Sequence, residues 1–246
     1  MADIEQLTII KQGVDSWNTW RLENPSVRID LGGADLSGLA LPQIDLNGAN
    51  LQDVNLDKAD LSEAKLSGAN LSESSLVNAN LRNANLSSAN VSDADLLNVI
   101  LVQANLTRAH LAKTDMSGSD LTGANVSEAN LHLVILSGAR LVRANLEGSK
   151  VREAKLVQAN LTGANLSRTD FAQSDMRLSI LENANLEKTS LIQVNLQGAN
   201  LEGVQNSMIS QFSKVHSLVE AQLDQQIFSD LQKDYPQLFL HTQSTI

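Results

Sequence analysis

The chain has 246 residues, no cysteine and a formal net charge of −10, and this excess of acidic side chains disfavours direct binding to nucleic acid. The longest apolar run, from Leu96 to Val102, is too short and too interrupted to cross a bilayer. The first 25 residues carry Asp3 and Glu5 and lack the basic start and apolar stretch of a secretory signal. We therefore expect a cytoplasmic protein without a membrane segment.

Residues 1–28 are expected to form an N-terminal helical cap. Apolar residues recur at helical spacing ahead of Pro25, at Ile4, Leu7, Ile10, Val14 and Trp17. A helix laid across the open end of a repeat stack covers unpaired backbone and prevents end-to-end association. We expect Trp17 and Trp20 to pack on the first part of the repeat; the alternative is an aromatic pair that binds a partner.

Residues 29–203 carry a repeat of five residues. An apolar residue stands at every fifth position from Leu31 to Leu201, and 29 of these 35 central positions are Leu. The other six are Val91, Met116, Val126, Val151, Phe171 and Met176. Most repeats place a small residue two positions before the centre and Asn or Asp between them, as in Ala49-Asn50-Leu51 and Ala59-Asp60-Leu61.

A period of five matches neither the 3.6 residues of a helical turn nor the alternation of a strand. Short extended segments joined by turns can instead close a coil, and stacked coils share one interior. Asn and Asp stabilise turns by bonding the backbone two residues on. Eleven of the 13 glycines fall two residues after a centre, where a turn can need a positive φ. The central and small residues are therefore expected to face inward, and Asn or Asp outward.

This pattern resembles the A(D/N)LXX motif of the pentapeptide-repeat family from residue 31 to residue 201. The resemblance implies an all-β solenoid, a right-handed quadrilateral parallel β-helix with four repeats per coil. Thirty-five repeats then make nearly nine coils. The segment Trp17-Asn18-Thr19-Trp20-Arg21 resembles a helix found ahead of such repeats in photosynthetic bacteria, which favours a cyanobacterial type.

Three isoleucines, Ile100, Ile135 and Ile180, stand where Asn or Asp faces water in other repeats. With four repeats per coil, Ile100 and Ile180 share one face and Ile135 lies on the preceding face. Two adjoining faces thus carry a possible partner surface, made of Leu97, Ile100, Val102, Ile135, Val142, Leu178 and Ile180. The alternative is that these side chains are tolerated on a rigid rod or are turned inward by local bulges.

The charge is uneven along the repeat. Between Arg28 and Asn98 there are ten acidic and four basic residues, which gives 4 − 10 = −6. A later basic group is the second candidate surface, and it comprises Arg140, Arg143, Lys150, Arg152 and Lys155.

No combination of residues indicates catalysis, a cofactor or a metal. His110 and His132 project from successive coils, but further metal ligands are lacking. Carboxylate pairs such as Asp115 with Asp120 are turn residues first, because acid–base catalysis needs a concave and partly dry site. We expect no catalytic, cofactor-binding or metal-binding residue.

Residues 204–246 are expected to form a C-terminal helical cap. Apolar residues recur here at steps of three or four, at Met208, Phe212, Val215, Val219, Leu223, Ile227 and Leu231. The segment Ser217-Leu218-Val219-Glu220 fits a capping box, which predicts a second helix from there to Lys233. The same tail could be a dimerisation element, so both a monomer and a dimer through the tail are left open.

These patterns favour a non-enzymatic scaffold or regulator that displays flat faces to a protein partner, whose identity the sequence does not give. One alternative is a DNA mimic that inhibits or protects gyrase or topoisomerase, as the quinolone-resistance members of the family do. The acidic charge favours that alternative, whereas the basic group and the single phenylalanine centre, Phe171, oppose it. A second alternative is a rigid spacer without a specific ligand.

Overall fold

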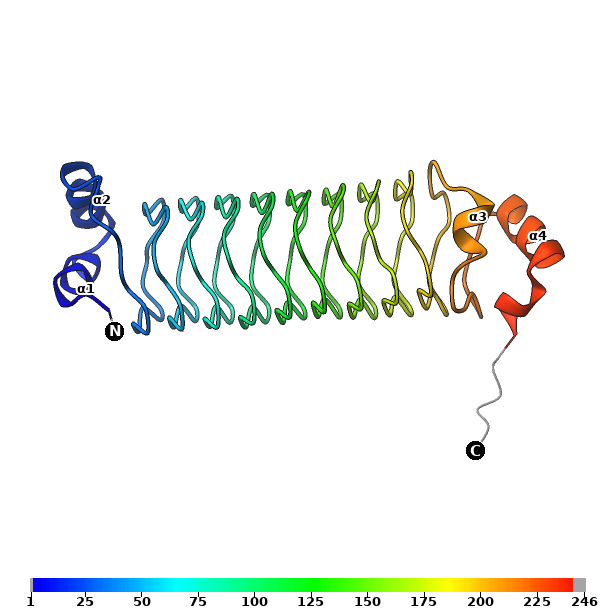
Figure 1. Cartoon of the computed structure of the whole chain (residues 1–246), viewed down its shortest axis with the longest axis horizontal. Helices are drawn as coiled ribbons and strands as arrows, with labels where there is room; N and C mark the ends of the chain where they lie inside the picture. The colour runs from blue at the N-terminus through cyan, green and yellow to red at the C-terminus, as the bar shows by residue number, and fades with distance from the viewer. Residues whose placement is uncertain (1, 241–246) are drawn as a thin grey trace, which may run out of the picture.

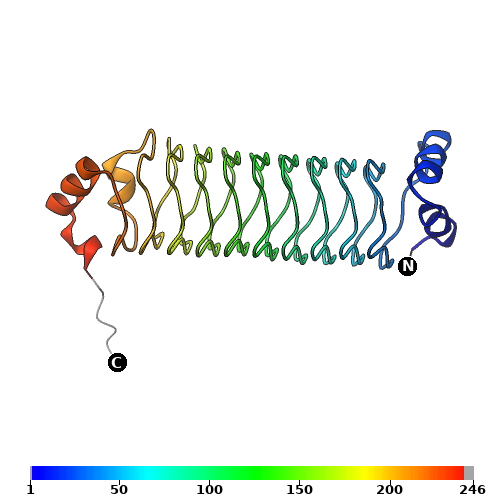
Figure 2. The ribbon, with the colours of Figure 1, turned by 180° about the vertical axis from the view of Figure 1, so that it is seen from behind.

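The computed structural model describes residues 2–240 of the chain. A stack of coils forms the middle of a rod, and helices cover both ends (Figure 1). The view from behind shows the same even stack (Figure 2). The helices are α1 (Ile4–Ile10), α2 (Val14–Glu23), α3 (Ile209–Phe212), α4 (Gln225–Asp234) and the 3₁₀ helix η1 (Pro236–Phe239). Residues 241–246 of the expected C-terminal cap and residue 1 of the expected N-terminal cap lie outside the described residues.

Each coil contains four repeats. Parallel β-bridges join residues twenty positions apart, from Asp30 with Asn50 to Asn185 with Gln205. Asn50 N donates to Ile29 O of the preceding coil at 3.0 Å, and Leu51 N donates to Asn70 O of the next coil at 2.7 Å. The extended segments between turns are very short, so the pairing within residues 2–240 consists of isolated bridges rather than regular strands.

The interior is filled by the five-residue repeat, as predicted. None of the 35 central residues is more than 2% exposed, and burying a leucine contributes about 2 kcal/mol. The small residues two positions earlier are buried too, apart from the partly buried Leu39. Where Thr or Ser takes the place of alanine, its hydroxyl bonds the backbone: Thr114 Oγ1 donates to Leu111 O at 2.8 Å. The prediction that both positions face inward is confirmed.

The coil corners have a left-handed backbone. The residue two positions after each centre has a positive φ, both where it is glycine, as at Gly48 (65°), and where it is not, as at Ser88 (57°). The predicted role of glycine is therefore confirmed, although most corners do without it. The Asn and Asp side chains also act as predicted: Asp35 Oδ1 accepts a hydrogen bond from Ser37 N at 3.1 Å.

The N-terminal segment folds over the first coil as two helices. Gly13, with a φ of 106°, separates α1 from α2. Trp17 on α2 is fully buried, and its Nε1 donates to Asp45 O of the first coil at 2.8 Å. Its ring centroid lies 5.2 Å from that of Trp20. The expectation that Trp17 packs on the start of the repeat is confirmed.

Two glutamines on the capping helices bond backbone groups at the ends of the stack. Gln6 on α1 is 4% exposed; its Oε1 accepts from Asp30 N at 2.8 Å and its Nε2 donates to Arg28 O at 3.0 Å. At the other end, Gln211 Nε2 donates to Leu186 O at 2.8 Å and to Thr189 O at 2.9 Å. Sequence reasoning missed both residues, because a single polar residue on a short helix leaves no periodic signal.

The C-terminal segment leaves the stack after Gln205, forms α3 and then rejoins the stack. Ser217 pairs with Asn195 and Gln222 pairs with Asn200, so the spacing is 22 residues instead of twenty. Leu218 is fully buried, and Glu220 has the φ of a coil corner, 58°. The prediction that a capping box at Ser217 begins a helix was wrong, because Leu218 fills the next central position of the coil.

The second C-terminal helix begins only at Gln225. Helix α4 packs over the last coil through the buried Leu231. The rings of Phe228 and Phe239 meet edge to face with centroids 5.1 Å apart. Leu218 N donates to Leu238 O at 2.8 Å and thereby ties η1 to the stack.

Candidate functional site

The outward residues of the bridges form four columns along the rod, which we number in chain order. Column 1 runs from Asp30 to Ser190, column 2 from Asp35 to Ser217, column 3 from Ala40 to Gln222, and column 4 from Asp45 to Gln205. We name each corner by the two columns that it joins. The columns and corners are the surface that the repeat offers, because the interior is filled.

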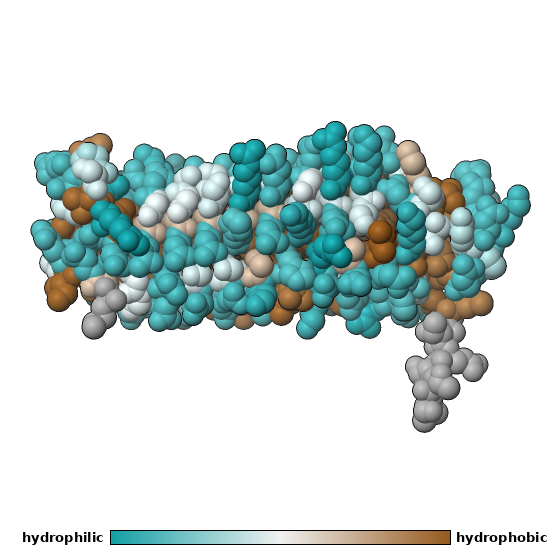
Figure 3. Space-filling model, viewed as in Figure 1, coloured by the Kyte–Doolittle hydropathy of each residue, from teal (hydrophilic) through white to brown (hydrophobic). Residues whose placement is uncertain are grey.

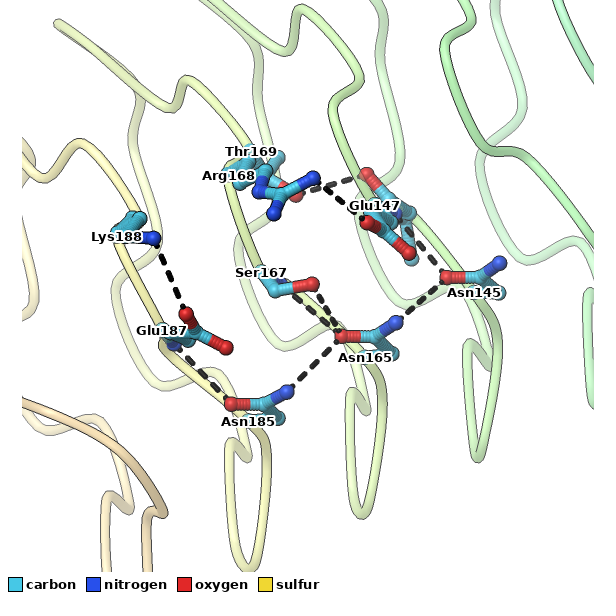
Figure 4. Close-up of polar contacts among 10 residues, drawn as sticks. Asn145, Glu147, Asn165, Ser167, Arg168, Thr169, Asn185, Glu187 and Lys188 are labelled. Carbon is cyan, nitrogen blue, oxygen red and sulfur yellow. Dashed lines mark hydrogen bonds and ion pairs between the residues drawn. The ribbon is translucent and has the colours of Figure 1, made fainter.

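Column 4 is a ladder of amides (Figure 4). Asn165 Nδ2 donates to Asn145 Oδ1 at 2.9 Å, and Asn185 Nδ2 donates to Asn165 Oδ1 at 3.2 Å. Each oxygen also accepts from the corner backbone, as Asn165 Oδ1 does from Ser167 N at 3.2 Å. These amides bond one coil to the next, so column 4 serves the structure first.

Column 3 carries two of the three isoleucines. Ile100 is 38% exposed and Ile180 is 36% exposed. Ile100 pairs with Asn80 and Asp120 in the ordinary register, so no bulge turns its side chain inward. Asp120, Arg140 and Asn160 separate the two isoleucines along the column. Column 3 therefore presents two apolar spots four coils apart.

Column 2 and its corner with column 3 carry most of the other candidate apolar residues. Ile135 is half-buried in column 2, between Asp115 and Lys155. At corner 2–3, Leu97 is 37% exposed and Leu178 is 53% exposed. The remaining two, which are half-buried at corner 3–4, are Val102 and Val142.

The structure adds apolar residues that sequence reasoning missed. Leu133 is 38% exposed and Ile192 is 46% exposed, both at corner 1–2. The signal was an apolar residue at a turn position, where most repeats have polar residues or glycine. On the side drawn in Figure 3, the surface is mainly hydrophilic, and apolar side chains gather at the two ends and in isolated spots between them. The candidate apolar residues thus form several small areas.

The basic group does not form one patch. In chain order its members lie on column 3 (Arg140), corner 3–4 (Arg143), column 1 (Lys150), corner 1–2 (Arg152) and column 2 (Lys155). They therefore circle the rod. Arg140 also lies 3.9 Å from Asp120, and Arg152 lies 3.8 Å from Asp170. Acidic neighbours therefore partly neutralise this ring of basic residues, which we call the basic girdle.

Acidic side chains are held by local hydrogen bonds. The pKa of Asp30 is lowered by the Asn50 side chain, which donates to its Oδ1 at 2.7 Å, and by the backbone of Gly32. Burial acts to raise the pKa of Asp175, but Arg177 outweighs it through hydrogen bonds and charge, with help from the charge of Lys155, so the pKa falls below its usual value. Arg177 Nη2 lies 2.7 Å from Asp175 Oδ2.

No cluster of three His, Cys, Asp or Glu residues that could hold a metal occurs between residues 2 and 240. His110 lies in column 1, whereas His132 lies at corner 1–2 of the next coil and faces Arg152 O at 3.2 Å from its Nδ1. Within the same described residues, the structure contains no helix long and apolar enough to span a membrane.

The fold defines a class of protein: a rod of stacked twenty-residue coils whose four columns display the outward position of a five-residue repeat. The chain belongs to the pentapeptide-repeat family. The model of the pentapeptide repeat region matches residues 49–125. The model of pentapeptide repeats in eight copies matches residues 29–68, 139–177 and 179–204. Among functionally curated proteins, none matches the chain.

Solved structures similar to this chain are pentapeptide-repeat and related proteins. HetL, a pentapeptide repeat protein involved in heterocyst differentiation regulation from the cyanobacterium Nostoc sp. strain PCC 7120, is 29% identical; the match covers 83% of this chain and 92% of HetL, with a TM-score of 0.42. QnrB1, a plasmid-mediated fluoroquinolone resistance protein, is 16% identical over 85% of this chain and 98% of its own, with a TM-score of 0.44. A pentapeptide repeat protein from the Arabidopsis thaliana thylakoid lumen is 22% identical over 54% of this chain and 74% of its own, with a TM-score of 0.23.

Proposed function

We propose that this protein is a non-enzymatic interaction scaffold or regulator, which presents the sides of a rigid rod to a protein partner. A filled interior leaves no room for a substrate, and enzymes place their catalytic groups in concave, partly dry sites. The even hydrogen-bonded stack holds side chains at fixed intervals, as a docking surface requires. We further assign the coil to the right-handed quadrilateral parallel β-helix class, which the four repeats per coil support. In this assignment α3, α4 and η1 form the cap over the last coil.

The observation that carries the proposal is the exposure of Ile100 and Ile180. Every other member of column 3 except Ala40 is polar or charged, whereas these two isoleucines are 38% and 36% exposed. Exposed aliphatic side chains cost solubility and contribute little to a fold whose centres are already buried. A partner that covers the exposed third or so of each side chain would gain roughly 0.5–1 kcal/mol at each site.

The test is the double variant I100N/I180N, which restores the usual residue at both positions. The wild type and this variant are each used as bait in affinity capture. Both should recover the same background proteins, but only the wild type should recover the partner. The matched control is Ile192→Asn, which removes an isoleucine of 46% exposure from corner 1–2. Equal partner recovery by the wild type and the double variant would reject the role of column 3 and leave the rigid-spacer alternative.

The DNA-mimic alternative has weaker support. A mimic of duplex DNA needs regular negative charge, whereas column 4 consists mainly of neutral asparagines and a basic girdle crosses the rod. Gyrase supercoiling at increasing concentrations of this protein tests the alternative. Inhibition at micromolar concentration would favour it over the scaffold.

A further inference from the structure

We propose that column 2 is an interface at which two copies of this chain pair side by side in antiparallel orientation. This proposal rests on the proposed function, since it names a second copy as one protein that a rod face binds. The two-fold axis crosses each rod at Ile135. The order of charges along the column favours this pairing.

The two charges next to Ile135 in column 2 have opposite signs. Asp95 and Asp115 precede Ile135, and Lys155 and then Asp175 follow it, at successive positions fixed by the parallel bridges. Neither Asp115 nor Lys155 takes part in an ion pair within residues 2–240. Asp115 Oδ1 accepts from Ser117 N at 2.9 Å and from Ser117 Oγ at 2.6 Å, which fixes its carboxylate beside the corner.

An antiparallel pair makes these charges complementary. When two column 2 faces meet head to tail about Ile135, each Ile135 faces its counterpart. Asp115 of one copy then lies opposite Lys155 of the second copy, and the symmetry produces this contact twice. At corner 1–2 the same operation brings Leu133 near Leu133 of the second copy, so the apolar centre is wider than one isoleucine.

Neighbouring charges support the same orientation. At corner 1–2, Lys113 lies one coil before Leu133 and Glu153 lies one coil after it, so these two also meet across the axis. Asp95 would meet Asp175 of the second copy. Arg177, whose guanidinium already bonds Asp175 at 2.7 Å, lies at that level and offsets one of these two negative charges.

Parallel pairing of the same faces places Asp115 opposite Asp115 and Lys155 opposite Lys155, which like charges oppose. Column 3 is a poorer candidate for self-pairing. The antiparallel arrangement that joins Ile100 to Ile180 of the second copy brings Arg140 opposite Arg140. The charge pattern therefore selects column 2 and the antiparallel orientation.

The contact area indicates a weak dimer. With the axis at Ile135, nine positions of column 2 overlap, from Asn55 to Ser217. At ~4.8 Å per coil and a face about 10 Å wide, each copy contributes roughly 400 Å². This is about half of the ~800 Å² per partner of a standard stable interface, so dimerisation should depend steeply on concentration and weaken with salt.

The experiment is sedimentation equilibrium of the full chain over a wide concentration range at low salt. The wild type should pass from monomer to dimer as concentration rises. Lys155→Asp and Asp115→Lys each turn two attractive contacts into two repulsive ones and should each weaken association at least about tenfold. The double variant D115K/K155D restores complementarity and should return to within about threefold of the wild type. Lys150→Asp, the same charge change on column 1, is the matched control and should have no effect.

A wild type that stays monomeric at every concentration overturns the proposal, as does a double variant that associates no better than the single variants. Far-UV circular dichroism of each variant verifies that the fold is intact. The two proposals fail separately, because I100N/I180N alters column 3 only. A dimer that survives I100N/I180N while partner capture is unchanged would reject the column 3 partner surface and keep the column 2 interface.

Discussion

The substitution Gln6→Met tests how the rod ends are closed. Gln6 is 4% exposed and bonds both Asp30 N and Arg28 O of the first coil. Methionine has a similar length and shape, so packing of α1 is retained while both hydrogen bonds are lost. Leaving a buried backbone group unpaired costs about 1–3 kcal/mol, so two such groups should cost roughly 2–4 kcal/mol after partial access by water.

This cost should be local, because each coil contacts only its neighbours and an end coil can open alone. Hydrogen exchange of the Asp30 amide measures it directly, and 2–4 kcal/mol corresponds to about 30- to 900-fold faster exchange. The Asp45 amide, which donates to Asn18 Oδ1 at 2.9 Å, is the internal reference and should change little. Thr8→Ala on the exposed side of α1 is the matched control. Exchange at Asp30 within threefold of the wild type would refute the role of Gln6.

Three further variants test the corners, the acid response and the amide ladder. Ser88→Gly relieves the strain of a left-handed corner and should raise the free energy of unfolding, measured in urea, by about 0.5–1 kcal/mol. Gly48→Ala at the same kind of corner should lower it by a similar amount. If both substitutions changed the free energy of unfolding in the same direction, the corners would not be strained as described. The lowered pKa of Asp30 contributes stability that is present above its usual pKa of 3.8 and is lost as pH falls through the lowered value. Asp30→Asn should therefore lower stability slightly at neutral pH and flatten the acid decline below about pH 4, so that the two stability curves converge at low pH. Parallel acid curves would contradict this. Asn165→Ala removes amide bonds to both neighbouring coils and should lower the free energy of unfolding by about 1–2 kcal/mol, and a change under 0.3 kcal/mol would show that the ladder is dispensable.

The coil could be predicted from the sequence because its period is strict. An apolar residue at every fifth position from Leu31 to Leu201 permits only a chain that turns every five residues, and the glycines two positions later mark the left-handed corners. The outward position of Ile100 and Ile180 followed from the same five-residue spacing. These features are repeated many times, so each repeat reinforces the prediction from the others.

The ends could not be predicted in the same way. The return of the chain at Ser217 is displaced by two residues from the register of the repeat, and the apolar residues there also fit helical spacing. Only the burial of Leu218 in the coil decides between the two interpretations. The backbone bonds of Gln6 and Gln211 depend on where short helices lie, which local spacing does not specify. The five basic residues between Arg140 and Lys155 are close in sequence but circle the rod, because twenty residues complete one turn of the stack.

The central claim is that the apolar residues in the outward columns serve binding and are not needed by the fold. The most direct test is the free energy of unfolding of I100N/I180N, measured by urea denaturation beside the wild type. The account predicts a difference of no more than about 0.5 kcal/mol, as for substitutions at surface sites. Asparagine at these positions can also join the turn and column hydrogen bonds that other repeats make. A loss of more than about 2 kcal/mol would contradict the account, because it would mean that Ile100 and Ile180 are part of what holds the coils together.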